Sequence, residues 1–247
     1  NAKGNGNVAA SNDVQAVATV APTVAVTSDK TSLKAGETAT ITFTFSEDPG
    51  SSFTAGDVSV TGGTLGAISG SGLTRTATFT PTPNTSTSAS IKVEAGVFTD
   101  AAGNPNVVGT GSTNLTNVTV DTTQPTVVIT DDEAGVANIA GGEVVFTFTF
   151  SEDVTGFTAD DVTISSGTKG TFTAVDAKTY TLAVTPEANS DEDLTVGVAA
   201  GVATNAKGNG NVAASNDVQA VDTIAPTVSV ASDKTSLKAG ETATLTF

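Results

Sequence analysis

A near-identical internal repeat constrains the fold of this chain more than any other feature. Residues 1–17 recur letter for letter at 205–221, and residues 23–43 return with few changes at 227–247. The period is therefore 204 residues, the distance from residue 1 to residue 205. Half of that period is also visible, because the motif FTFSED occurs at 43–48 and again at 148–153. Repetition of this kind indicates tandem structural units, and it has to be recognised before any other feature is interpreted.

The repeat predicts two complete units flanked by two partial ones. We expect the complete units at residues 21–121 and 122–222. Residues 1–20 are expected to hold the C-terminal strand of a preceding unit, and residues 223–247 the first two strands of a following unit. The chain would then begin and end within domains, as an excerpt of a longer array does.

Alternating polarity predicts that each complete unit consists of short β-strands. In ATITFTF (39–45), Ile41, Phe43 and Phe45 alternate with threonines, which is the pattern of a half-buried strand. Further runs are expected to point inward through Leu73, Ala77 and Phe79, and through Ile91, Val93 and Ala95. About seven such strands in roughly 100 residues, with turn residues between them, are typical of an immunoglobulin-like sandwich. The predicted fold class is all-β, with tandem immunoglobulin-like β-sandwich domains in a linear array.

Composition argues against catalysis and against several kinds of partner. The chain has no His and no Cys, which removes the commonest general base and the thiolate ligands of metals. A formal net charge of −16 repels nucleic acid and anionic membranes, and it attracts divalent cations. No apolar run approaches the roughly 20 residues of a membrane helix. With no Trp and a single Tyr, the chain offers no aromatic-walled cleft for a carboxylate glycosidase. We therefore expect no enzyme, no nucleic-acid partner and no membrane insertion.

Three ordered motifs carry a resemblance to a known family. They are SDKTSLKAGETATITFTFSE (28–47), FTAGDV (53–58) and GVFTDAAGN (96–104). Together they resemble the bacterial Ig-like repeats in the extender region of giant repetitive surface adhesins, many of them RTX-type proteins. The resemblance implies a secreted or cell-surface location and a spacer role. It also implies Ca²⁺ at the junctions between domains, where the ion stiffens the rod. The partners would be neighbouring repeats of the same chain, and the fragment itself would be monomeric.

The predicted strand order places several acidic turns at one pole of each unit. If the first strand runs away from the linker, the second returns to it, so the Ser-Glu-Asp turn and the late loop at 205–211 both lie near the linker. Carboxylate and carbonyl oxygens are the ligands that Ca²⁺ prefers. We call such a Ca²⁺ site at a junction between two units a clamp. The clamp ahead of the second unit is expected to use Asp121, Glu152, Asp153 and the side-chain carbonyl of Asn205 or Asn209.

By the same count, the corresponding candidate ligands elsewhere are Glu47, Asp48, Asp100 and Asn104 in the first unit, and Asp222 ahead of the next one. Ala18 stands where Asp121 and Asp222 stand, so the clamp ahead of the first unit should be weaker or absent. The alternative is that Asp, Asn and Gly simply fill turns, because they make Asx-turns and tolerate left-handed backbone. For Asp57 and Asp161, a hydrogen bond to a neighbouring turn is favoured over metal binding.

Three functions are consistent with these observations. The leading one is a non-catalytic, Ca²⁺-stiffened extender of a bacterial adhesin or biofilm protein. The second is a ligand-binding adhesive module for a glycan or host protein, which would need variable loops and exposed aromatic residues. The third is a self-assembling extracellular filament or surface-layer subunit, which would form oligomers that persist on dilution.

Overall fold

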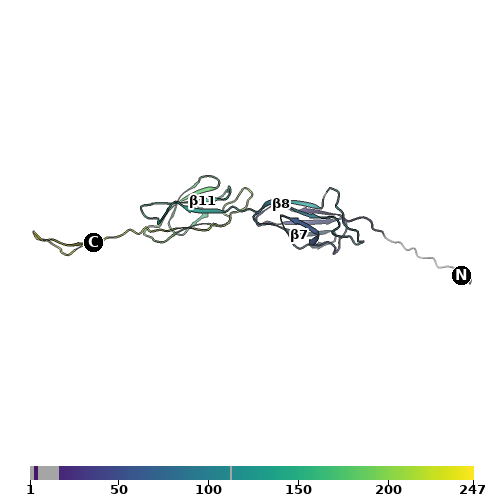
Figure 1. The fold of residues 1–247 in the computed structure, drawn as a ribbon, viewed down its shortest axis with the longest axis horizontal. Coiled ribbons are helices and arrows are strands. Elements are labelled where there is room, and N and C mark those ends of the chain that lie inside the picture. The colour runs from purple at the N-terminus through teal and green to yellow at the C-terminus, as the bar shows by residue number, and fades with distance from the viewer. Residues whose placement is uncertain (1–2, 5–16, 112) are drawn as a thin grey trace. The chain divides into compact units, whose positions relative to one another are not determined.

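The computed structural model describes residues 3–4, 17–111 and 113–247 of the chain. It divides into two compact units, which we call domain 1 (Asn1–Thr123) and domain 2 (Gln124–Phe247). Strands β7 and β8 of domain 1 and β11 of domain 2 are labelled in Figure 1. The only helices among the described residues are two single 3-10 turns, Ala55–Asp57 and Ala159–Asp161. In that part of the chain, no helix has the length and apolar character needed to cross a membrane.

Domain 1 is a sandwich of two sheets. The first sheet has the order β1-β3-β7-β5, with β6 also paired to β7; its strands are β1 (Val24–Ser28), β3 (Ala39–Phe45), β5 (Gly63–Leu65), β6 (Ser69–Ser71) and β7 (Thr74–Pro81). The second sheet has the order β2-β9-β8-β4; its strands are β2 (Ser32–Lys34), β4 (Val58–Thr61), β8 (Ser86–Val93) and β9 (Leu115–Asp121). All ladders are antiparallel except β2 with β9, which is parallel.

The core of domain 1 follows the predicted alternation. Ile41, Phe43 and Phe45 of β3 are buried, and threonines alternate with them. Phe53 and Phe98 come from the loops and pack edge-to-face on Phe45, with ring centroids 4.8 and 5.2 Å away. Such aromatic pairs add specific geometry to the burial of apolar surface. The Ser-Glu-Asp turn and the late loop therefore rest on the same aromatic cluster at one end of the sandwich.

Domain 2 repeats this plan. One sheet has the order β10-β11-β14-β13, with strands β10 (Val127–Asp131), β11 (Val144–Phe150), β13 (Thr168–Ala174) and β14 (Thr179–Thr185). The other has the order β12-β15-β16, with strands β12 (Val162–Ile164), β15 (Leu194–Val198) and β16 (Asp217–Gln219). The parallel contact of domain 1 is reduced to one isolated bridge, Ala137 with Val221. The all-β fold of tandem Ig-like sandwiches is thereby confirmed.

Two inward positions predicted from the alternation are wrong. Leu73 is 50% exposed because β7 begins only at Thr74, and Arg75 is the buried residue at the next inward position. Ala95 is exposed because β8 ends at Val93 and the chain then turns. In both cases the period-2 pattern continued in sequence beyond the ends of the strand, although Leu73 O still accepts from Phe45 N (2.9 Å).

Residues 231–246 form a separate hairpin of β17 (Ala231–Ser232) and β18 (Leu245–Thr246). Its register pairs Ser232 with Leu245, which is the pairing of Ser28 with Ile41 shifted by one period. The side chain of Asp233 also accepts from the backbone of Thr244, as Asp29 does from Thr40. The strand predicted within residues 1–20 falls largely on residues 1–2 and 5–16, which lie outside the described residues.

Candidate functional site

The starting pole of domain 2 brings together the three segments that the strand order predicted. Antiparallel pairing of Val127 with Phe150 places the Ser-Glu-Asp turn beside the first residues of the domain, and the Thr126 backbone nitrogen donates to Ser151 Oγ (3.0 Å). The late loop joins them, because Gln124 Nε2 donates to Gly210 O (2.9 Å) and Val212 N donates to Pro125 O (2.9 Å). These backbone contacts define the pole on which the candidate ligands lie.

Within this pole, Glu152 and Asn205 are in contact. The Asn205 side-chain nitrogen donates to Glu152 Oε1 at 3.2 Å. Asn205 is buried, and its Oδ1 accepts from the backbone nitrogens of Lys207 (3.0 Å) and Asn209 (2.9 Å). The side-chain carbonyl of Asn205 is thus already used to close its own loop. Asp153 is exposed beside Tyr180, whose pKa is raised by burial and secondarily by the charges of Asp176 and Asp153.

Domain 1 arranges the corresponding residues differently. Asp100 Oδ1 accepts from the backbone of Ala102 and Asn104 (2.9 Å each), and Asp100 Oδ2 accepts from the Asn104 side chain (2.8 Å). These bonds, with the Asn104 side chain contributing most, lower the pKa of Asp100. Asp48 instead forms an ion pair with buried Arg75 (3.2 Å). Glu47 is half-buried beside it in the same turn. Of the candidate ligands in domain 1, Asp100 and Asn104 therefore contact each other, whereas Asp48 contacts Arg75.

Asp121 and Asp222 each organise the segment that follows a domain's last strand. Asp121 Oδ1 accepts from Thr123 N (3.2 Å), and Asp222 Oδ1 accepts from Ile224 N (3.1 Å). Each is an Asx-turn, the structural role that the alternative interpretation predicted.

The threonine after each aspartate is buried and was missed from the sequence. Thr122 Oγ1 donates to Thr82 O (2.7 Å), and Thr223 Oγ1 donates to Glu187 O (2.6 Å). The repeated Asp-Thr pair at 121–122 and 222–223 was the available signal.

Comparison with known proteins identifies the family. The profile of the bacterial Ig-like domain matches residues 18–120 and again residues 121–221. The chain belongs to the bacterial Ig-like domain family. No curated protein sequence matches it significantly.

Three solved structures resemble these Ig-like domains. The adhesin FdeC of Escherichia coli has 18% identity and a TM-score of 0.41, over 81% of this chain and 63% of that one. The adhesin InvE of Yersinia pseudotuberculosis has 16% identity and a TM-score of 0.33, over 81% of this chain and 58% of that one. Domains 5–6 of the S-layer protein SbsC have 18% identity and a TM-score of 0.27, over 83% of this chain and 100% of that one. The chain thus spans less than two thirds of both adhesin structures.

Asp57 and Asp161 have the structural role that the sequence favoured. Asp57 Oδ2 accepts from the backbone and the hydroxyl of Thr54 (2.7 and 2.9 Å), and Asp161 Oδ2 does the same with Thr158 (2.8 Å each). Each forms a capping box on a single 3-10 turn. Over the described ranges as a whole, no group of three or more acidic side chains is arranged to hold a metal ion. The clamp that combines Asp121 of domain 1 with Glu152 and Asp153 of domain 2 stays a prediction.

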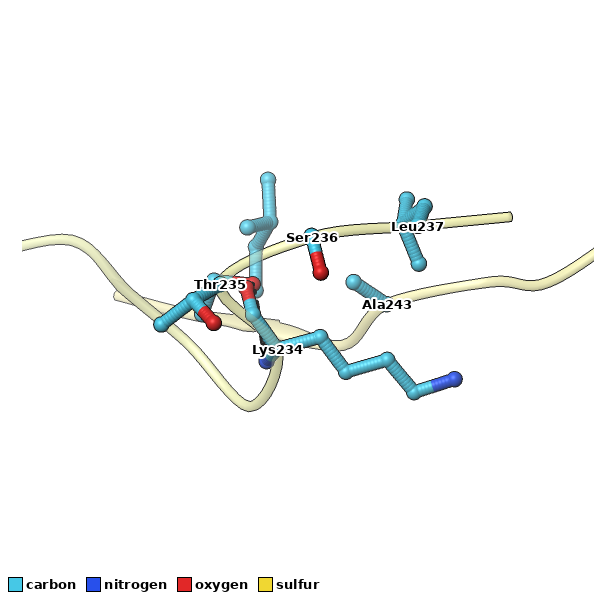
Figure 2. Close-up of a pocket in the computed structure, with 7 residues that line it drawn as sticks. Lys234, Thr235, Ser236, Leu237 and Ala243 are labelled. Carbon is cyan, nitrogen blue, oxygen red and sulfur yellow. Dashed lines mark hydrogen bonds between the residues drawn. The ribbon is translucent and has the colours of Figure 1, made fainter.

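Two shallow hollows lie on the surface of the described residues. One of about 420 Å³ lies along the 231–246 hairpin, with Lys234, Leu237 and Ala243 in its lining (Figure 2). Leu237 is 53% exposed, whereas its repeat equivalent Leu33 is buried in the core of domain 1. This hollow is therefore the inward face of a hairpin and not a built pocket. The other hollow, of about 170 Å³ beside Ile139 and Pro186, is lined by no titratable side chain.

Proposed function

We propose that this chain is a non-catalytic spacer segment of a bacterial surface adhesin or biofilm protein, stiffened by Ca²⁺ at the junction between its Ig-like domains. The spacer role is supported by the way β2, near the start of domain 1, is joined to β9, the last strand of the domain. Ser32, Leu33 and Lys34 of β2 pair in parallel with Thr119, Val120 and Asp121 of β9. In this parallel pair, the N-terminal end of β2 and the C-terminal end of β9 lie at opposite ends of the ladder.

This pairing suits a domain that bears tension. A pull on the two ends of the domain shears the β2–β9 ladder, so its hydrogen bonds are loaded together and not one after another. The contact of Val26 N with Thr113 O (2.8 Å) adds a further bond between the first strand and the last segment. Because forced unfolding is governed by the unfolding rate, a ladder loaded in shear raises the force that the domain withstands.

The chain between the domains also offers little slack. Thr122 is buried at the end of domain 1, and Pro125 is buried at the start of domain 2. Of the two residues between them, Thr123 donates its backbone nitrogen to Asp121, and Gln124 donates its side chain to Gly210. A short, tethered connection is what a spacer needs if tension and stiffness are to pass along it.

Charge and ligand chemistry support the proposed Ca²⁺ site at the junction. Asp121 lies at the outgoing end of domain 1, and Glu152 and Asp153 lie at the incoming pole of domain 2. Extracellular modules bind Ca²⁺ with dissociation constants of about 10⁻⁴–10⁻³ M. The proposal places the protein outside the cell, where such weak sites are filled. Export of the RTX type remains part of the proposal.

The spacer role is tested by pulling the full chain between its ends in a single-molecule force experiment. Domain 1 should unfold at a higher force than domain 2, whose parallel contact is one bridge. Leu33→Pro, which removes a ladder hydrogen-bond donor, should lower the force for domain 1 selectively. If the two domains unfold at the same low force, and Leu33→Pro changes neither, the load-bearing role fails.

Calcium is tested separately by calorimetry and small-angle scattering of the full chain in Ca²⁺ and in EDTA. Binding heat and a longer, stiffer particle in Ca²⁺ are expected. Asp121→Asn combined with Glu152→Gln should abolish both effects, whereas the exposed control Asp191→Asn should retain them. No binding heat and unchanged scattering would remove calcium from the proposal and leave the spacer role to the force experiment.

A further inference from the structure

Two carboxyl groups of domain 2, those of Asp131 and Asp217, lie on strands that contact each other. Asp217 begins β16 and Asp131 ends β10. Oδ2 of Asp217 exposes less than 1 Å², and among the described residues it is the only buried side-chain nitrogen or oxygen without a hydrogen-bond partner. Buried polar atoms almost always have a partner, so this one requires an explanation.

No charged side chain on the neighbouring strands, all of them within the described ranges, pairs with that oxygen. Asp217 Oδ1 accepts from Val218 N (3.1 Å), and Asp131 Oδ1 accepts from Glu133 N (2.8 Å). β15, which pairs with β16, brings no titratable side chain, and neither does β11, which pairs with β10. The nearest further charges in sequence, Asp132 and Glu133 after β10 and Asp193 before β15, are also acidic. Within the described part of the chain, neither Asp131 nor Asp217 forms an ion pair with Lys or Arg.

A proton resolves this arrangement. Two carboxylates in contact cannot both ionise without mutual repulsion, and burial adds to the cost of the charged form. We propose that Asp131 and Asp217 share one proton, the hydroxyl of one donating to the other, so that domain 2 is more stable in mild acid than at neutral pH. Burial first, and then the charge and hydrogen-bonding proximity of Asp131, raise the pKa of Asp217.

The direction of the pH effect follows from proton linkage. A carboxyl with a raised pKa binds its proton more tightly in the folded state than in the unfolded one. Falling pH therefore stabilises the folded domain from the raised value down to the unfolded value, about 3.9 for Asp. Rising pH ionises both groups and withdraws that stabilisation.

Domain 1 provides an internal comparison. Ser28 opposes Ile41 where Asp131 opposes Phe146, and Thr116 opposes Ile91 where Asp217 opposes Val196. Hydroxyl side chains thus occupy both positions in domain 1, where the Ser28 hydroxyl donates to Lys30 O (2.7 Å), and neither hydroxyl carries a titrating carboxyl proton. The pair makes the two Ig-like domains different in acid response while their folds stay the same.

The experiment uses the single tyrosine of the full chain as a reporter. Tyr180 is buried in domain 2 and the chain has no Trp, so tyrosine fluorescence follows the unfolding of domain 2 alone. The thermal midpoint should rise as the pH is lowered from about 7.5 to about 4.5. Asp217→Asn, whose amide can donate to Asp131, should raise the midpoint at neutral pH and flatten its pH dependence. Asp191→Asn removes the same charge from an exposed turn and should keep the wild-type slope.

Each other outcome overturns the proposal. A midpoint independent of pH would show that the two groups share no proton. Equal flattening by Asp191→Asn would assign the effect to the general negative charge. If Asp217→Asn lowers the midpoint at neutral pH, and Ca²⁺ raises it in the wild type only, the pair binds a cation instead. A carbon-13 carboxyl titration by NMR, with one group titrating well above ordinary aspartate, is the direct spectroscopic confirmation.

Discussion

Arg75 of domain 1 occupies the ladder position that Tyr180 occupies in domain 2. Arg75 lies opposite Phe43, and Tyr180 lies opposite the equivalent Phe148. Each side chain fastens the turn that follows the phenylalanine-rich strand: Arg75 binds Asp48 and Gly50 O, and the Tyr180 hydroxyl donates to Val154 O (3.2 Å). The two domains thus fasten the same turn with unlike chemistry.

Arg75→Ala should destabilise domain 1 by about 2 kcal/mol, because it removes hydrogen bonds to the backbone oxygens of Gly50 and Gly72 and the packing of a long, buried stem. Asp48 is half-exposed, so no buried charge is stranded. Lys92→Ala, which breaks the exposed pair with Glu94, should cost about 0.5 kcal/mol or less. Calorimetry of the full chain measures both, with the domain 2 transition assigned by Tyr180 fluorescence. Equal losses for the two variants would contradict the fastening role of Arg75.

Asn106→Ala should cost domain 1 about 3 kcal/mol. Asn106 is buried, its Oδ1 accepts from Val97 N (2.8 Å) and Phe98 N (3.0 Å), and its Nδ2 donates to Glu94 O (2.8 Å). Removal strands buried backbone groups, each of which costs about 1–3 kcal/mol. Asn117→Ala, at an exposed strand position, is the matched control and should stay within about 0.5 kcal/mol. Urea unfolding measures the free energy of unfolding of both variants, and equal losses would contradict the role of Asn106.

Asp161→Ala should lower the stability of domain 2 by about 1 kcal/mol, the usual cost of a lost capping residue. The neighbouring Asp160→Ala removes the same charge from an exposed position of the same 3-10 turn and should have little effect. Tyr180 fluorescence during urea unfolding measures both variants. A loss that appears only in the presence of Ca²⁺ would instead make Asp161 a metal ligand.

Domain 1 should lose stability in acid through Asp100. Its pKa is lowered chiefly by the Asn104 side chain, so the ionised form is favoured in the folded state. The contribution is fully present above the unfolded pKa of about 3.9 and is lost as the pH falls through the lower folded value. Domain 2 has Asn205 at this position, and Asp100→Asn should make the acid dependence of domain 1 shallower. An unchanged acid profile in calorimetry would contradict this assignment.

The sequence predicted the sheets and the meeting of the loops, because both follow from local patterns. The alternation of Phe43 and Phe45 with threonine fixes which face is buried, and the strand order places the Ser-Glu-Asp turn near the late loop. Hydrogen-bond partners at the pole were harder to predict. Asn205 has a side-chain carbonyl oxygen of the kind that binds Ca²⁺. In the structure that oxygen accepts hydrogen bonds from the backbone of its own loop, and this follows from the folded conformation of the loop and not from its sequence.

Contacts set by register between distant strands were not predictable from the chain. Arg75 is the one charged residue among the inward positions of an alternating strand, and its burial depends on contacts with Asp48 and Gly50 of a different segment. The contact of Asp131 with Asp217 requires two strands from opposite ends of domain 2 to end and begin at one place. A single-residue shift in either register would separate the two carboxyl groups.

The 231–246 hairpin pairs in its repeat register through contacts made within its own turn. A chain synthesised from its N-terminus can therefore form the equivalent pairing of domain 1, β1 with β3, before β7 to β9 have been made. Residues 227–247 are nearly identical to 23–43, whereas the intervening domain differs. Domains 1 and 2 consequently present unlike opening hairpins, which disfavours exchange of strands between these two domains during synthesis.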